Sequence, residues 1–467
     1  MIRNITAPKN PADKTTSDKR RFSISAALIV KVVLVIVTLG FFGFVIPSFF
    51  NEVAVFAQTL VKSTNFTIEG NTFSIDDIKK DPSLKKDSNG RTNVMLIGID
   101  TREYGKESSI KNTDSMMVAS YDSKTNRVSL ISFPRDLVIN YPNTSSYGKI
   151  NATYAYGEAP RNGGNGLEYL KTALERLTGQ KIQYYAMINL HGFMTVIDQL
   201  GGIDVYVENS FTDYKYPTDN YRWRTVSFTK GWMHMNGDQA LAYARSRHSQ
   251  QNGEGSDFAR ARRQQKVIQA VIDQAQKQEN LQNPKKIFEI LNTIASSIKV
   301  NQLTPEDIQA GLQILTEKGK PPVYTSVMDP TAGNSTLIQV GGFGTGYNIT
   351  AKPNYKNFGN ITQFLNDFVE EPTMWHYNMT IPVYNGKGSN FTQRYGAITK
   401  RFFYNKFKNA GSTDEYQGTL VFNTSGKEYE YLGNFIAKNI GGTYVDASDS
   451  SVQAPRPGSP IVIVLGK

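Results

Sequence analysis

The stretch DSMMVASYDSKTNRVSLISFPRD, residues 114–136, reads as two β-strands joined by a short polar turn. If the hairpin centres between Lys124 and Thr125, Asp114 lies opposite Arg135. A carboxylate and a guanidinium then meet at the open end of the strand pair. The sequence therefore predicts an ion pair at one edge of a β-sheet.

Helix-like and strand-like segments surround this hairpin in alternation. The preceding run NVMLIGID has the length of a strand and ends at Asp100. The segments that follow are a helix over 165–179, a strand over 184–190, a helix over 191–202 and a strand over 203–208. This alternation predicts an α/β layer architecture, in which ligands gather at the carboxyl ends of strands.

The C-terminal part predicts a second, smaller α/β domain. From about residue 321 to 371 the chain is rich in glycine, asparagine and proline and has little periodicity. The segments beyond it are a strand over 380–385, a helix over 390–411, a strand over 419–423, a helix over 427–442, and strands over 443–446 and 460–466.

The N-terminus predicts a membrane anchor. Residues 26–46 are apolar apart from Lys31, and at a rise of about 1.5 Å per residue they span about 30 Å, the thickness of a hydrocarbon core. The preceding tail carries six basic residues against Asp13 and Asp18, which favours a cytoplasmic tail and an exported remainder. A signal peptide cleaved near Val55-Phe56-Ala57 is the alternative, and it exports the same residues.

The composition favours an anionic partner and excludes several classes of protein. The 467 residues carry a net charge of +11 and contain no cysteine, which excludes disulfides and thiolate chemistry. The four histidines show no metal-ligand spacing, and neither a Walker sequence nor a serine-hydrolase elbow is present. GGFGTG at 341–346 has glycine-fingerprint spacing, but no clear strand or helix flanks it. Export and the lack of a DNA-binding motif argue against nucleic acid.

Five arginines lie within residues 244–265: Arg245, Arg247, Arg260, Arg262 and Arg263. Residues 256–275 predict a helix whose apolar stripe comprises Phe258, Ala261, Ile268, Val271, Ile272 and Ala275. A second stripe holds Asp257, Arg260 and Gln264, whereas Arg262 and Arg263 are expected to face solvent. A short helix that begins at Asn236 or Asp238 precedes Arg245.

Two interpretations of these arginines remain open: a solvated charged face, or a cradle for an anion. Two guanidinium groups about 6 Å apart repel each other by roughly 3 kcal/mol at an effective dielectric of 20, so convergence favours a bound anion. Asp100 and Asp114 are likewise either turn or cap residues, or ligands of a hard cation held together with a phosphate.

Seven motifs occur in order over about residues 90–275: LIGIDTRE, NTDSMMVAS, VSLISFPRD, GKINATYAYG, DQLGGIDVYVE, MNGDQALAYARSRH and DFARARRQQ. This series resembles the LytR-CpsA-Psr (LCP) family of bacterial envelope proteins, with family-like sequence continuing to about 370. The last ninety residues resemble the small C-terminal domain of some members, through IPVYNGKG and IVIVLGK.

The resemblance implies an extracytoplasmic enzyme with an α/β/α layered catalytic domain, in the cell membrane through a single N-terminal helix. Such enzymes transfer a glycopolymer from a polyprenyl-pyrophosphate carrier to peptidoglycan, form a phosphodiester and release polyprenyl phosphate. The implied domains are a cytoplasmic tail over 1–25, a transmembrane helix over 26–48, a connector over 49–89, a catalytic domain over 90–372 and a LytR-type C-terminal domain over 373–467.

The resemblance also implies residue roles. Asp100 and Asp114 match the site of Mg²⁺, for which Mn²⁺ is an alternative. Arg135, Arg245 and Arg247 match arginines that hold the pyrophosphate and act in catalysis. Further matches at the pyrophosphate site are Arg102, Lys149, Asp257, Arg260 and Gln264.

Two departures from the family pattern stand out, and one rival function stays open. Asn112, next to Lys111, occupies a position where many members have arginine, and the loop 249–256 is longer than usual. The rival is a non-catalytic binder of pyrophosphate-linked lipid glycans or cell wall, which needs the arginines but not both aspartates. The residues assign no general base.

Overall fold

The computed structural model describes residues 66–68, 71–73, 83–99, 112–218, 222–275, 298–300, 307, 310, 321–330, 337–377, 379–402, 406–447, 452–455 and 458–467. Within these ranges no helix has the length and apolar character needed to cross a membrane. The anchor predicted over 26–48 lies outside the described residues, and so do Asp100, Arg102 and Lys111.

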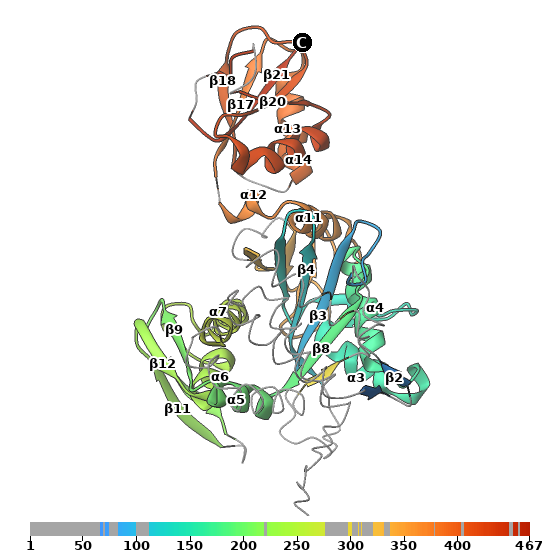
Figure 1. Cartoon of the computed structure of the whole chain (residues 1–467), viewed down its shortest axis with the longest axis vertical. Helices are drawn as coiled ribbons and strands as arrows, with labels where there is room; N and C mark the ends of the chain where they lie inside the picture. Colours follow the sequence, from blue (N-terminus) through green and yellow to red (C-terminus); the bar gives the residue numbers. More distant parts are fainter. Residues whose placement is uncertain are drawn as a thin grey trace, which may run out of the picture.

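A six-stranded mixed sheet forms the centre of the first unit, in the order β13-β8-β3-β4-β5-β14 (Figure 1). Strands β3, β5, β8 and β14 run in the same direction, because β3 is parallel to β8, β5 is parallel to β14, and β4 is antiparallel to both β3 and β5. The carboxyl ends of these four strands therefore lie at one edge. The bounds are β3 Arg91–Ile99, β4 Thr113–Asp122, β5 Arg127–Phe133, β8 Tyr184–Asn189, β13 Ile298–Val300 and β14 Val323–Val327.

The predicted register of the hairpin is confirmed. Met116 pairs with Phe133 and Asp122 pairs with Arg127, so β4 and β5 are centred between residues 124 and 125. Both strands bury side chains on two faces, so the turn at residues 123–126, rather than an apolar face, sets the register.

Helices cover both faces of the sheet. One face packs against α4 (Gly166–Thr178) and α11 (Gly359–Glu370) in a shared core that includes Met116, Leu174 and Phe364. The other face, with Met117 and Leu130, packs against Ile268 of α7 (Asp257–Ala275). This is a mixed α/β architecture with helices on both sides of the sheet.

Helix α11 corrects the expectation that residues 321–371 lack periodic structure. Its buried side chains Ile361, Phe364, Leu365 and Phe368 have helical spacing. Glycine, asparagine and proline on both flanks obscured this pattern in the sequence. The segment also contains β14, β15 (Ile338–Val340) and β16 (Ile349–Ala351).

A second lobe packs against the opposite side of α7 (Figure 1). Its elements are α5 Leu190–Gln199, β9 Ile203–Val207, β10 Phe211–Pro217, β11 Trp223–Phe228, β12 Gly231–Met235 and α6 Gly237–Arg245. Helix α7 therefore contacts two cores, and the single apolar stripe predicted for it is wrong. Ala259, Val267 and Ala270 are buried, whereas Ala261 and Val271 are only half-buried.

The C-terminal part forms a five-stranded sheet in the order β18-β17-β21-β19-β20 with its own core. The bounds are β17 Ile381–Gly386, α13 Phe391–Phe402, β18 Phe407–Ser412, β19 Thr419–Asn423, α14 Glu430–Ile440, β20 Thr443–Asp446 and β21 Ile461–Gly466. The helix predicted over 390–411 is wrong beyond Phe402, since residues 407–412 form an edge strand. That strand is mostly exposed, so it has no alternation of apolar and polar residues to reveal it.

Candidate active site

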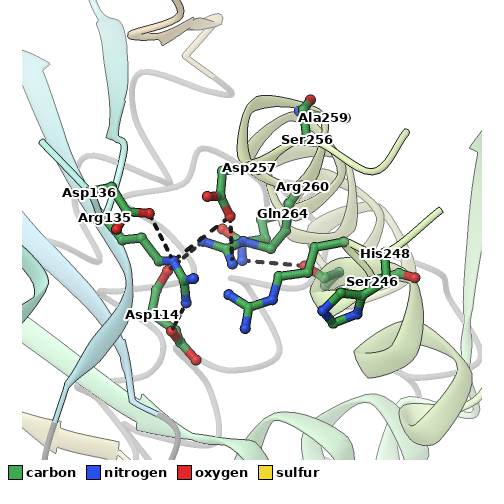
Figure 2. A network of polar contacts seen from close by, with 12 residues as sticks. Asp114, Arg135, Asp136, Ser246, His248, Ser256, Asp257, Ala259, Arg260 and Gln264 are labelled. Atoms are coloured by element: carbon green, nitrogen blue, oxygen red, sulfur yellow. Dashed lines mark hydrogen bonds and ion pairs between the residues drawn. The ribbon is translucent and has the colours of Figure 1, made fainter. Parts of the chain in front are cut away.

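The predicted ion pair between Asp114 and Arg135 is present. Asp114 lies at the start of β4 and Arg135 follows the end of β5, and Arg135 Nη1 is 3.1 Å from Asp114 Oδ1. Figure 2 shows both side chains at the edge of the sheet, facing Asp257 and Arg260 of α7. The hairpin register thus places the pair at the carboxyl ends of the parallel strands.

Arg135 is the centre of a group of carboxylates. Its Nε lies 3.3 Å from Asp136 Oδ2 and 3.8 Å from Asp257 Oδ1, in addition to the contact with Asp114. Burial disfavours the charge of Arg135, but the carboxylates of Asp257, Asp114 and Asp136 outweigh it and raise the pKa of the guanidinium. Arg135 is therefore held charged and in a fixed orientation.

Asp136 belongs to this group although the sequence did not single it out. Its side chain is buried, and Lys149 Nζ lies 2.6 Å from Asp136 Oδ1. Lys149 ends β7 (Tyr147–Lys149), which pairs with β6 (Val138–Asn140). The FPRD motif could have suggested Asp136, because the residue follows Arg135 directly.

Arg260 brings helix α7 into the same group. Its Nη1 is 3.0 Å from Asp257 Oδ1, one turn away, and its Nη2 donates to the backbone oxygen of Asp114 at 3.3 Å. Burial lowers the pKa of Arg260, and its Nε is buried with no hydrogen-bond partner within the described residues. Asp114, Arg135, Asp136, Lys149, Asp257 and Arg260 are called the charged cluster below.

Arg245 and Arg247 lie on a turn that Asp213 holds. Helix α6 begins with a capping box between Asn236 and Gln239, as the first of the two predicted starts, and ends at Arg245. Asp213 of β10 is fully buried, and its Oδ2 accepts from Ser246 Oγ at 2.5 Å and from the backbone N–H of Arg247 and His248 at 3.1 Å each. The sequence offered no signal for Asp213.

Arg263 holds the same turn from the other side, and the expectation that it faces solvent is wrong. Only 3% of its side chain is exposed. It donates to the carbonyl oxygens of Tyr243 and Ser246 and forms an ion pair with Glu254 at 2.5 Å. Its neighbour Arg262 does face solvent and pairs with Asp329 at 3.0 Å. Arg263 is buried, unlike Arg262, because α7 packs against two cores and therefore buries side chains on several faces.

The remaining predicted residues contact this turn. The Arg245 guanidinium lies 5.9 Å from the ring centroid of Tyr216, and Gln264 Nε2 donates to the backbone oxygen of Ala244 at 3.3 Å. The Arg247 side chain is half-buried and makes no hydrogen bond or ion pair within the part of the chain that the structure describes. Its charge contributes to lowering the pKa of Arg260, so the two guanidinium groups repel each other.

Replacing Asp213 by asparagine is expected to destabilise the turn in a pH-dependent manner. Burial disfavours the Asp213 charge, but hydrogen bonds from Ser246, Lys215, His248 and Arg247 outweigh this and lower its pKa below the ordinary value of 3.8. A carboxylate with a depressed pKa stabilises the fold above the unfolded pKa and loses this contribution as pH falls through the folded value.

Urea unfolding of the wild type and Asp213→Asn between pH 7 and pH 3 would measure this effect. We expect the variant to be less stable by about 1–3 kcal/mol at neutral pH, with the difference shrinking below the ordinary aspartate pKa. A difference that is constant with pH would mean that the charge of Asp213 plays no part.

The charged cluster can supply only part of a metal site. Within the described residues no group of three or more His, Asp or Glu side chains could hold a metal ion. Asp114 is half-buried, and one of its oxygens already contacts Arg135. A site with so few carboxylate ligands would suit a hard cation such as Mg²⁺. Such an ion commonly takes one or two carboxylates and completes its shell with water and phosphate oxygens.

The chain is similar to a known protein family and to several curated proteins. Residues 53–331 match the family model of the LytR_cpsA_psr family. Among curated relatives, the chain is 30% identical over 238 residues to the polyisoprenyl-teichoic acid–peptidoglycan teichoic acid transferase TagU of Bacillus mycoides, covering 49% of this chain and 69% of TagU. It is 31% identical over 222 residues to the transferase TagV of Bacillus subtilis, covering 47% of this chain and 53% of TagV.

The relative TagV of Bacillus subtilis also has a solved structure that resembles this chain. The crystal structure of B. subtilis TagV aligns with 25% identity and a TM-score of 0.44, covering 60% of this chain and 97% of TagV. A structure of TagT bound to LI-WTA aligns with 20% identity and a TM-score of 0.41, covering 60% of this chain and 91% of that chain.

Proposed function

The chain belongs to the LytR_cpsA_psr family, and on that premise we propose that it transfers a glycopolymer from a polyprenyl-pyrophosphate carrier to peptidoglycan. The relatives TagU and TagV carry names that specify a polyisoprenyl-linked teichoic acid and peptidoglycan. On this proposal, the chain is a phosphotransferase of the cell-wall glycopolymer ligase type.

The observation that carries the proposal is the convergence of cations at the carboxyl edge of the central sheet. Arg135, Lys149 and Arg260 come from three separate segments and pair with three neighbouring carboxylates, all of which Arg135 contacts. Planar guanidinium groups bind phosphate oxygens bidentately, and the Arg247 side chain has no ion-pair partner among the described residues. A pyrophosphate would supply the missing negative charge.

The proposed reaction needs positioning and charge neutralisation rather than a covalent intermediate on the protein. An acceptor hydroxyl oxygen forms a bond to the phosphorus that bears the glycan, the P–O–P bond breaks, and polyprenyl phosphate leaves. The hydroxyl proton passes to a base that we do not assign. Arg135, Arg247 and Lys149 would hold the phosphate oxygens as charge builds on them.

Asp114, together with Asp100 if it lies at the same edge, would provide carboxylate ligands for Mg²⁺ or Mn²⁺. Such an ion polarises the attacked phosphate when it is bound.

We further propose that residues 26–48 anchor the chain in the cell membrane, with the catalytic unit outside the cell. Residues 373–467 would then form a LytR-type C-terminal domain.

A release assay tests the proposed function. The full chain in detergent is incubated with a synthetic polyprenyl-pyrophosphate saccharide and a peptidoglycan acceptor, and polyprenyl phosphate is followed by mass spectrometry with Mg²⁺ or with EDTA. We expect metal-dependent release that falls roughly tenfold to a hundredfold in Asp114→Ala and in Arg247→Ala, because each removes a charge-assisted contact. Tight binding of the donor without any release would favour the non-catalytic binder.

A further inference from the structure

The glycine-rich stretch at 341–346 lies at a position in the fold where a nucleotide-binding fingerprint would not occur. It lies in the loop 341–348, which joins the antiparallel strands β15 and β16. A phosphate-binding fingerprint would instead join a strand to a helix. The loop also lies outside the residues 53–331 that match the family model.

The loop is attached directly to the charged cluster. The backbone N–H of Ile349, which follows the loop, donates to the backbone oxygen of Asp136 at 3.0 Å, and Ile349 forms a β-bridge with Leu137. The carboxylate of the same Asp136 binds Lys149. The C-terminal end of the loop is therefore next to the charged cluster.

Internal hydrogen bonds hold the loop in one conformation. Asn348 is buried, and its Nδ2 donates to the carbonyl oxygens of Phe343 at 2.6 Å and Gly346 at 2.9 Å. Gly344 and Gly346 have φ of 57° and 87°, which side chains other than glycine rarely adopt. A loop fixed in this way can present a side chain without an entropic cost of ordering.

A row of rings links the loop to Lys149. The centroid of Phe343 lies 5.1 Å from that of Tyr355, and Tyr355 lies 5.1 Å from Tyr147. Tyr147 and Lys149 are two residues apart on β7, so they face the same side of the strand. The row therefore begins beside the cluster and ends in the loop.

Tyr347 is the exposed ring of the loop. Its exposed fraction is 48%, and within the described residues it makes no contact with another ring. Partial burial, followed by the carboxylates of Asp257, Asp136 and Asp329, raises its pKa. Tyr347 is two residues from Ile349, whose backbone bonds to Asp136, so Tyr347 lies on the part of the loop next to the charged cluster.

We propose that Tyr347 binds the sugar ring that is joined to the pyrophosphate of the donor. The inference rests on the proposed function. Aromatic faces pack against the C–H face of a sugar, and a protonated tyrosine can donate to its hydroxyls. The loop sequence GGFGTGYN has no aliphatic side chain, which argues against a surface for the polyprenyl tail. The donor sugar is favoured over the acceptor because it is covalently joined to the anion that the cluster would hold.

Binding of two ligands to the full chain in detergent separates this inference from the proposed function. One ligand is polyprenyl pyrophosphate that bears a single sugar, and the other is the same lipid without the sugar. We expect Tyr347→Ala to weaken binding of the first about threefold to tenfold, the usual value of one aromatic contact, and to leave the second unchanged. Tyr347→Phe should retain most of the affinity. Tyr214→Ala is the matched control, because Tyr214 is an exposed tyrosine on β10.

Each outcome has one meaning. Equal weakening of both ligands, or no weakening of the sugar-bearing one, overturns the assignment of Tyr347. Unchanged donor affinity with a raised KM for the acceptor would assign the ring to the acceptor and also overturn it. If the wild type binds neither ligand, the proposed function itself fails. Tyr347→Leu replaces the alanine variant if that variant does not fold.

Discussion

Arg135→Ala is expected to lower the rate of polyprenyl phosphate release about a hundredfold to a thousandfold, the loss typical when one preorganised electrostatic contact to the reacting group is removed. Arg135 is the residue that contacts Asp114, Asp136 and Asp257 together. Its removal leaves these carboxylates at the place where the proposed pyrophosphate binds. Substrate repulsion would then add to the loss of the guanidinium.

The release assay with Arg135→Ala, Arg135→Lys and Arg127→Ala measures this effect. Arg127 lies at the other end of β5 and pairs with Glu371 at 2.8 Å, so it controls for the loss of an ion-paired arginine from the same strand. Lysine keeps the charge but not the planar fork, and should recover part of the rate. A rate in Arg135→Ala equal to that in Arg127→Ala would exclude Arg135 from the proposed chemistry.

The sequence predicted the part of this site that depends on strand register. Asp114 and Arg135 are 21 residues apart, yet a centred hairpin brings them together, and the structure confirms that pairing. Periodicity also predicted α4, α5 and β9, each of which buries one face, and an apolar run of strand length predicted β8, whose residues pack in two different cores. Patterns of this kind are local, so the sequence alone can carry them.

The sequence could not predict contacts between buried polar groups. Asp213 binds the backbone of residues more than thirty positions away, and that requires the fold of the second lobe. Asp136 contacts Arg135 and also Lys149, which lies thirteen residues further on in β7. Helix α7 shows the same limit, since a helix between two cores buries polar and apolar side chains on several faces and has no single stripe.

Arg262 and Arg263 illustrate this limit most clearly, and they lead to the second large prediction. The two are neighbours of the same residue type, and no sequence pattern distinguishes them. Half of the Arg262 side chain is exposed, at 51%, whereas the Arg263 side chain is 3% exposed. Arg263→Met is expected to lower the free energy of unfolding by about 3–5 kcal/mol, because it removes a buried guanidinium together with its bonds to a mostly buried carboxylate and two carbonyl oxygens. Arg262→Met should lower it less, because the Arg262 guanidinium is half-exposed, although its loss also removes a cation from the buried Asp329 carboxylate.

The physical basis lies in what Arg263 leaves behind. The carboxylate of Glu254 would lose its cation, and the carbonyl oxygens of Tyr243 and Ser246 would lose a donor. Methionine retains the packing of the stem against Phe211, whose ring centroid lies 4.8 Å from the guanidinium, so the loss reports the polar contacts. Urea unfolding followed by circular dichroism measures both variants under the same conditions. Equal stability of the two variants would show that the buried contacts of Arg263 do not hold the turn that carries Arg247.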